Sequence, residues 1–293
     1  MTTRMHDDQV DPTPDDVRRL LSAQHPQWSG LPVTRVAESG TDHALFRLGD
    51  DLVARLPVIA WADGQATAEA ACWPPLAPHL PVAVPVPLAL GVPDDGYPFA
   101  WSVNPWLPGG RPDASTDRMV LARDLAGFVG ALRGCDATAA PPATSRGLPL
   151  DRPERDAATR RSLARSGDVV DATAALAAWE EARRAPVWPG PPTWLHGDLT
   201  AGNLLVVDGR LSAVIDAAPV AGDPAVELAA CFQLFGPADR ALVRETLGTD
   251  DAEWARARGW AVSIAAMEIA YYRETRPELA ERSIRSIEAV LSE

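Results

Sequence analysis

The feature that most constrains the fold is residues 194–216, where short apolar segments alternate with loops that carry acidic and amide side chains. An apolar pair opens the stretch, a polar loop with Asp198 and Asn203 follows, and Asp216 ends the last apolar segment. Asp208-Gly209 lies between two apolar runs, which is typical of a β-hairpin turn. We therefore expect a strand, a polar loop and a hairpin in this order.

The three polar side chains are of the kind that phosphoryl transfer requires. That reaction needs oxygen ligands for Mg²⁺, a carboxylate that orients the acceptor hydroxyl, and positive charge on the phosphates. Asp198, Asn203 and Asp216 are candidates for the first two requirements. Singly, each is equally compatible with a turn, a cap or a solvent-facing strand end. The catalytic interpretation depends on their common strand, loop and strand context.

The same stretch resembles the catalytic loop of the aminoglycoside phosphotransferase and choline kinase family, which shares the protein-kinase fold. The family pattern HGDxxxxN, with a hairpin and a strand-ending Asp after it, is matched by His196, Gly197, Asp198, Asn203 and Asp216. The resemblance implies that Asp198 is the catalytic base and that Asn203 and Asp216 bind Mg²⁺. It implies a packing role for His196. It also implies an α+β, protein-kinase-like bilobal fold, with a small β-rich N-lobe and a larger, mainly helical C-lobe.

The resemblance further implies a site for ATP or GTP, the phosphate donor, in the first third of the chain. The residues that it assigns there are Ser39, Gly40 and Thr41 over the phosphates, Arg55 on the α- and β-phosphates, Glu69 as the partner of Arg55, and Pro105 and Leu107 at the base. Arg55 suits its role because a guanidinium offers a planar fork of donors to carboxylates and phosphates. Pro105 keeps a carbonyl acceptor, and Leu107 offers an N–H donor. After the metal strand, Gly222-Asp223-Pro224 and Glu227 resemble a structural brace of the family.

The hydrophobic pattern predicts a flexible tail over residues 1–14, an N-lobe over 15–107 and a helical C-lobe over 108–293. In the N-lobe we expect strands near 33–38, 44–48, 52–56 and 100–107, helices at 15–24 and 66–76, and an alternating half-buried strand over 82–88. Prolines at 74, 75 and 78 are expected to end the second helix. In the C-lobe, helices are expected near 116–134, 151–164, 171–185, 224–235, 237–247, 251–274 and 276–291.

The charge balance is strongly acidic, with 27 Lys and Arg residues against 40 Asp and Glu residues and a formal net charge of −13. Such a surface repels nucleic acid and is compatible with a cationic acceptor, although acidity also simply favours solubility. The three cysteines are far apart and outside any CxxC pair, so neither a disulfide framework nor a structural zinc site is indicated. Because no apolar run reaches about 18 residues, we expect no membrane span and a cytoplasmic protein, either a monomer or a homodimer.

Two departures from the family pattern leave alternatives open. Thr200-Ala201 stands where His-Pro is common, and Ala217-Ala218 follows the metal-binding Asp where bulkier residues or Gly are usual. The alternatives are a catalytically degenerate protein that only binds nucleotide or ligand, and a kinase of a small metabolite such as choline or a sugar. Sequence signatures of other nucleotide-binding or hydrolase classes, such as GxxxxGK[ST], GxGxxG, GxSxG and HExxH, are absent.

Overall fold

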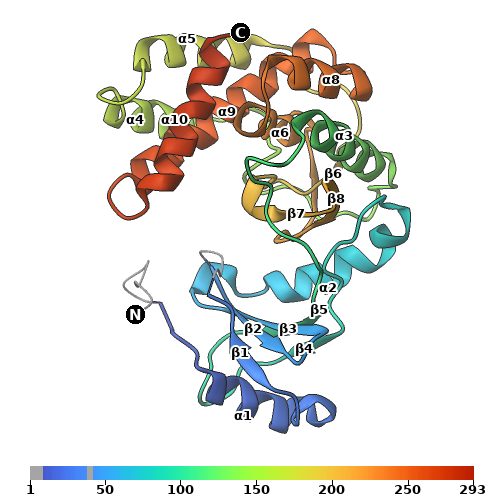
Figure 1. Cartoon of the computed structure of the whole chain (residues 1–293). Helices are drawn as coiled ribbons and strands as arrows, with labels where there is room; N and C mark the ends of the chain where they lie inside the picture. Colours follow the sequence, from blue (N-terminus) through green and yellow to red (C-terminus); the bar gives the residue numbers. More distant parts are fainter. Residues whose placement is uncertain (1–8, 38–41) are drawn as a thin grey trace. The chain divides into compact units, whose positions relative to one another are not determined.

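The computed structural model describes residues 9–37 and 42–293, and these form two compact units (Figure 1). The first unit holds the described residues up to Pro78, together with Ala83–Pro108 and Ala213–Ala218. The second holds His79–Val82, Gly109–Ser212 and Pro219–Glu293. The boundaries drawn from the sequence stay predictions. The structure adds that the short segment Ala213–Ala218, late in the chain, belongs to the first unit.

The first unit is built on an antiparallel sheet in the order β1-β2-β3-β5-β4. Its strands are β1 (Val33–Arg35), β2 (His43–Leu48), β3 (Leu52–Pro57), β4 (Ala89–Gly91) and β5 (Trp101–Pro105), and its helices are α1 (Pro14–Gln24) and α2 (Gln65–Leu76). Figure 1 shows α1 and α2 on opposite faces of this sheet. Gly49, with φ at +57°, makes the tight β2–β3 turn in a conformation that glycine adopts without steric cost.

One face of the sheet forms the core of the first unit. Phe46, Leu56 and Trp101 are fully buried there and pack with Leu20 of α1 in a single apolar cluster. Because side chains alternate along a strand, the residues between them face the other way. Arg55 therefore belongs to the opposite face, the one that α2 covers.

Helix α2 ends at Leu76, as predicted, and Pro74 and Pro75 lie inside its last turn. The helix begins at Gln65, so neither proline falls in the first turn, where a missing N–H would be tolerated. Trp73, fully buried, ties this end of α2 to the segment 213–218 because its indole N–H donates to the carbonyl of Ala217 at 2.9 Å.

The segment 82–88 corrects one prediction. It has the apolar alternation of a strand, but it forms an isolated bridge between Ala83 and Ala213, and the regular strand β4 begins at Ala89. Its prolines at 85 and 87 remove the N–H groups that a ladder would need. Burial does not follow the alternation either, since Val84 is buried and Leu88 is 55% exposed.

The second unit is mainly helical. Its helices are α3 (Arg118–Gly134), α4 (Pro153–Arg165), α5 (Ala172–Arg184), α6 (Ala225–Leu228), α7 (Cys231–Leu234), α8 (Pro237–Leu247), α9 (Asp251–Tyr272) and α10 (Pro277–Leu291). Helix α9 is the centre of the packing and contacts α4, α5, α6 and α10. Gly259 permits the close approach to α5, since a Cβ there would lie 2.4 Å from the Cβ of Ala182.

Short strands carry the loops of the second unit. They are β6 (Thr193–Leu195), β7 (Leu204–Val207), β8 (Arg210–Val214) and β9 (Val220–Gly222), paired as β6–β9 and β7–β8. Strand β9 was not predicted, and the single helix expected over 224–235 is divided into α6 and α7. Across the part of the chain that the structure describes, every helix is too short or too polar to cross a membrane.

Candidate active site

In the first unit, Arg55 holds two carboxylates at once. Its Nη1 donates to Glu69 of α2, and its Nη2 donates to Asp216. Glu69 is fully buried and the Arg55 side chain is 9% exposed, whereas the Asp216 side chain remains 38% exposed. The pairing expected between Arg55 and Glu69 is thus present in the structure, and the predicted metal ligand Asp216 joins it.

The electrostatics of this cluster keep Arg55 charged. Burial opposes the charge of Arg55, but Asp216 and Glu69 outweigh it and raise the pKa of the guanidinium above its usual range. Burial also raises the pKa of Glu69, against the attraction of Arg55. His43 lies beside the pair, with Nδ1 3.4 Å from Nη2 of Arg55. Burial and this neighbouring cation lower the pKa of His43 well below its usual value, so the ring is neutral and can accept.

The backbone at Asp216 is unusual. Its φ of +67° lies in the left-handed region, which non-glycine residues seldom adopt and which is found disproportionately at functional sites. The next residue, Ala217, is buried and accepts the hydrogen bond from the Trp73 indole. The segment after Asp216 is therefore held to α2 by the large indole ring of Trp73, beside the small side chain of Ala217.

The end of β5 presents free backbone groups, as expected for a base-binding segment. Trp106 donates its N–H to the carbonyl of Asp51 at 2.7 Å, so the backbone of Trp106 faces β3. In extended chain, the groups of the adjacent residues point the opposite way. On that side β4 pairs only as far as Val103. The carbonyl of Pro105 and the N–H of Leu107 thus lack a strand partner there.

In the second unit, the buried carboxylate of Glu227 accepts a hydrogen bond from the loop after β6. Gly197 has φ at +78°, and its N–H donates to Oε1 of Glu227 at 2.6 Å. The Asp198 N–H donates to Nδ1 of the buried His196 at 3.2 Å. Glu227 is 3% exposed, and its burial raises the pKa of the carboxyl although His196 and Gly197 oppose this. Both His196 and Glu227 thus have the packing and bracing positions expected for them.

Asn203 ends a short 3₁₀ turn, Ala201–Asn203, directly before β7. Its Nδ2 donates to the carbonyl oxygen of Asp198 at 2.8 Å and lies 3.3 Å from Oδ2 of the same residue. The amide oxygen accepts no hydrogen bond from the described residues. The Nδ2 group is therefore occupied by hydrogen bonds, and the amide oxygen keeps its lone pairs for a metal ion.

The carboxylate of Asp198 has a partner that the sequence reasoning missed. Arg146, in the loop between α3 and α4, forms an ion pair with Oδ1 of Asp198 and donates to the carbonyl of Gly197 at 3.1 Å. Partial burial works against ionisation, but Arg146 outweighs it and lowers the pKa of Asp198 below its usual value. Asp198 is consequently an ionised carboxylate. No local motif marks Arg146, because it lies about fifty residues upstream and only the fold brings it to the loop.

Asn203 and Asp216 have the chemistry of magnesium ligands. Mg²⁺ prefers carboxylate and carbonyl oxygens and usually retains several waters, so it does not need a complete cage of protein side chains. In line with this, no group of three or more His, Cys, Asp or Glu residues in the described ranges is arranged to hold a metal. Each of these two side chains is thus, by its own chemistry, a possible ligand of Mg²⁺.

A pocket in the second unit has Asp198 in its wall. Its other lining residues are Arg146, Gly197, Leu199, Thr200, Val226, Ala229, Ala230, Gln233, Ala261, Ile264, Ala265, Glu268 and Ser286. These residues come from the loop after β6, from Arg146 in the loop between α3 and α4, and from the segments around α6, α7, α9 and α10. The space that they enclose is small, about 30 Å³, and the Asp198 carboxylate borders it.

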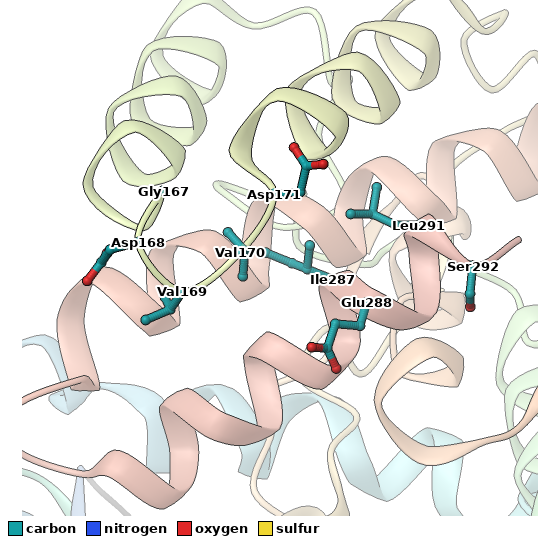
Figure 2. A pocket seen from close by; sticks show the side chains of 9 residues that line it. All are labelled: Gly167, Asp168, Val169, Val170, Asp171, Ile287, Glu288, Leu291 and Ser292. Carbon is teal, nitrogen blue, oxygen red and sulfur yellow. The ribbon is translucent and has the colours of Figure 1, made fainter.

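A second hollow of about 530 Å³ lies where the loop after α4 meets the end of α10 (Figure 2). Val170 and Ile287 supply part of its apolar lining. Two of its three acidic residues have local roles: Asp168 pairs with Arg273 at 2.6 Å, and Asp171 caps α5. Nothing in this hollow resembles the groups around Asp198.

Ser39, Gly40 and Thr41, predicted to cover the nucleotide phosphates, lie outside the described residues. Their role stays a prediction. Of the other predicted residues, the structure groups Arg55, Glu69 and Asp216 in the first unit. It groups Asp198 and Asn203 in the second.

Comparisons with known proteins agree on one family. The model of the phosphotransferase enzyme family matches residues 33–260. No curated protein matches the chain. Among solved structures, the macrolide 2′-phosphotransferase MphH from Brachybacterium faecium is 25% identical, with a TM-score of 0.61 and coverage of 94% of this chain and 97% of that one. Aminoglycoside-modifying relatives are also similar.

One of these is APH(2″)-IIIa, in complex with GDP and kanamycin, at 17% identity, with a TM-score of 0.70 and coverage of 94% of this chain and 98% of that one. Another is APH(2″)-IIa in a ternary complex with streptomycin and ATP, at 17% identity, with a TM-score of 0.60 and coverage of 92% and 94%. These matches confirm the predicted α+β, protein-kinase-like fold with a small antiparallel sheet and a larger helical part.

Proposed function

Because the chain belongs to the phosphotransferase enzyme family, we propose that it moves the γ-phosphate of ATP or GTP onto a hydroxyl of a small molecule, an aminoglycoside or another antibiotic. The observation that carries the proposal is the ionised Asp198 carboxylate in the wall of a pocket, on a loop braced by Glu227. A carboxylate held in this way can orient and deprotonate an acceptor hydroxyl. The solved relatives with bound GDP, ADP or ATP support a nucleotide donor.

In the proposed mechanism, each unit supplies a separate set of groups. Arg55, braced by Glu69, neutralises phosphate oxygens of the nucleotide, while the carbonyl of Pro105 and the N–H of Leu107 bind the base. Asn203 and Asp216 would hold Mg²⁺, which when bound would neutralise negative charge on the nucleotide phosphates. Arg55 pairs with Asp216 in this structure. If Asp216 holds Mg²⁺ and Arg55 contacts phosphate, these contacts would replace that ion pair.

In the second unit, Asp198 accepts the proton of the acceptor hydroxyl. The oxygen of that hydroxyl forms a bond to the γ-phosphorus while the bond between this phosphorus and the β,γ-bridging oxygen breaks, and ADP or GDP leaves. Nδ2 of Asn203 donates to the backbone carbonyl and the carboxylate of Asp198 and so holds Asp198 in place. The amide oxygen of Asn203 takes no part in these contacts. The pairing of Asp198 with Arg146 keeps the carboxylate ionised before the acceptor binds. A cytoplasmic location and a monomeric or homodimeric state stay predictions of the sequence.

Two alternatives make different predictions. A catalytically degenerate protein would bind nucleotide without consuming it, and a small-metabolite kinase would accept choline or a sugar. The test is nucleotide consumption by the purified chain with and without Mg²⁺, in the presence of candidate acceptors, beside a calorimetric titration of nucleotide. Magnesium-dependent consumption above the acceptor-free rate supports the proposal. Nucleotide binding without consumption for any acceptor would favour the degenerate protein, and absence of binding would refute the site.

A further inference from the structure

The space beside the Asp198 carboxylate is too small for an acceptor. It measures about 30 Å³ and has Arg146, Gly197 and Glu268 in its wall. A water molecule fits into such a space, whereas sites for small molecules usually measure about 300–1,000 Å³. In this structure the surroundings of the candidate base therefore admit water and exclude a larger molecule.

Both carboxylate oxygens of Asp198 already have a donor. Oδ1 pairs with Nη1 of Arg146, and Oδ2 lies 3.3 Å from Nδ2 of Asn203. Nη1 of Arg146 also donates to the carbonyl of Gly197 at 3.1 Å, so the guanidinium contacts both the base and its loop. Hydrogen bonds between charged groups are stronger than those between neutral groups. A nucleophile that uses Asp198 as its base must therefore compete with Arg146.

The backbone on both sides of Arg146 is anchored to β9 and to the residue after it. On one side, the N–H of Ala143 donates to the carbonyl of Ala221 at 2.8 Å. On the other side, the carbonyl of Gly147 accepts from the N–H of Asp223 at 2.8 Å. The backbone of Arg146 is thus fixed within the second unit. Its guanidinium can leave Asp198 by rotation about the side-chain bonds alone.

Glu268 is a second carboxylate near the guanidinium of Arg146. Burial opposes the charge of this guanidinium, but Asp198, Glu268 and Glu227 outweigh it and raise its pKa. Glu227 is buried and holds the loop, whereas Glu268 lines the same small space as Arg146. Glu268 forms no ion pair with an Arg or His of the described residues, and its Oε2 accepts from a serine hydroxyl. A guanidinium that leaves Asp198 therefore has a second anionic partner close by.

From this arrangement we propose that Arg146 is a specificity-determining residue, which reserves the Asp198 base for an acceptor hydroxyl and withholds it from water. The inference rests on the proposed function and deepens it. In the empty site, Arg146 occupies the base. A bound acceptor uses its other contacts to place a hydroxyl at Asp198 and displaces the guanidinium toward Glu268, whereas a single water has no such contacts.

The reaction that Arg146 suppresses is hydrolysis of the nucleotide. In this reaction the water oxygen forms a bond to the γ-phosphorus, the bond from this phosphorus to the β,γ-bridging oxygen breaks, and ADP or GDP and inorganic phosphate are formed. One proton of the water passes to Asp198 and then to solvent. Nucleotide consumed in this way modifies no acceptor, so the ratio of hydrolysis to transfer measures the contribution of Arg146.

The test measures the release of inorganic phosphate from ATP, and separately from GTP, by the full chain with Mg²⁺ and no acceptor. Phosphate transfer to kanamycin and to a macrolide is measured in parallel. The assays are run at about pH 7.5, where a carboxylate is ionised with or without a cationic partner. Wild type is compared with Arg146→Gln, which removes the charge, and with Arg146→Lys, which keeps it.

Arg155→Gln is the matched control. Arg155 of α4 lies close enough to Arg146 for the two charges to interact, but it donates to Ser145 Oγ at 2.8 Å and not to Asp198. This variant therefore removes a neighbouring positive charge without freeing the base. The double variant Arg146→Gln with Asp198→Asn shows whether hydrolysis uses the base. Circular dichroism and thermal unfolding establish that each variant is folded.

We expect Arg146→Gln to raise acceptor-free hydrolysis by about tenfold or more, the scale of one hydrogen bond between charged groups. Transfer should change less, because the guanidinium has left Asp198 when the acceptor is bound. Arg146→Lys should raise hydrolysis less than Arg146→Gln does, and Arg155→Gln should leave it at the wild-type rate. The double variant should lose the added hydrolysis. A merely structural role for Arg146 would instead lower hydrolysis and transfer together.

Several results would overturn the inference. Acceptor-free hydrolysis that is unchanged or lower in Arg146→Gln is one, and an equal rise in Arg155→Gln or in Arg146→Lys is another. A rise that persists in the double variant would show that the hydrolysis does not use Asp198. Failure of the proposed function would differ from all of these, because wild type would then neither bind nucleotide nor transfer phosphate to any acceptor.

Discussion

Replacement of Arg55 by Met tests the buried ion pair of the first unit. Removal of the guanidinium leaves the fully buried Glu69 carboxylate without its cation, whereas the half-exposed Asp216 can be solvated. Loss of one partner of a buried pair destabilises a protein by about 3–5 kcal/mol, because the remaining charge is uncompensated. Replacement of both partners, in Arg55→Met with Glu69→Leu, removes the unpaired charge as well. We expect the double variant to recover most of the lost stability and to remain unable to bind nucleotide.

The assay is urea unfolding followed by the fluorescence of buried tryptophans such as Trp73 and Trp101, together with calorimetric titration of nucleotide. The matched control is Arg210→Met, which breaks an ion pair with Asp124 whose guanidinium is 68% exposed and should change stability by less than about 1 kcal/mol. Normal nucleotide affinity in Arg55→Met would refute the phosphate-binding role. Equal stability of the single and double variants would refute the argument from an uncompensated charge.

Three further predictions concern the loops. Asp198→Asn should lower turnover by about 10²–10⁴-fold and leave the nucleotide Kd nearly unchanged by calorimetry, since the base acts on the acceptor; a lost nucleotide affinity would instead indicate a structural role. Asp216→Ala should abolish turnover at every Mg²⁺ concentration, and normal magnesium-dependent activity would show the ligand assignment to be wrong. Glu227→Leu should cost about 1–3 kcal/mol in urea unfolding because the Gly197 N–H is left unsatisfied, whereas Glu227→Gln keeps an acceptor. Burial raises the pKa of Glu227 in the folded state. The free energy of unfolding should therefore fall as the pH rises from the unfolded pKa of this carboxyl through its folded pKa. Glu227→Gln cannot ionise, so its free energy of unfolding should not show this fall.

Much of the fold follows from local signals in the sequence. The helix over 237–247 has the predicted bounds, since Pro237 starts it and Gly248 ends it in the left-handed conformation. The sequence indicated β3 with nearly correct limits, because Gly49 makes the turn that precedes it. Predictions failed where long-range packing overrides local preference. The segment 82–88 alternates as a strand would, but it forms no regular strand, and β4 begins only at Ala89.

Some residues of the candidate site could likewise be predicted from local sequence patterns, and others could not. Asp198 and Asn203 could be found because the loop places them a few residues apart, and the chain positions of Arg55 and Glu69 matched a family pattern. Arg146 could not be found in this way. It lies on an irregular loop, far from Asp198 in sequence, and only the packing of the second unit brings its guanidinium to the carboxylate.

The central claim, transfer of phosphate to a small-molecule hydroxyl, is tested most directly by the mass of the acceptor. Purified protein is incubated with Mg²⁺ and with ATP or GTP, and with aminoglycosides, macrolides, peptide antibiotics or choline, and each acceptor is then weighed by mass spectrometry. We predict that one acceptor gains the mass of a single phosphoryl group with wild type and remains unmodified with Asp198→Asn. Nucleotide binding without a mass increase on any acceptor, or an equal increase with Asp198→Asn, would contradict the account.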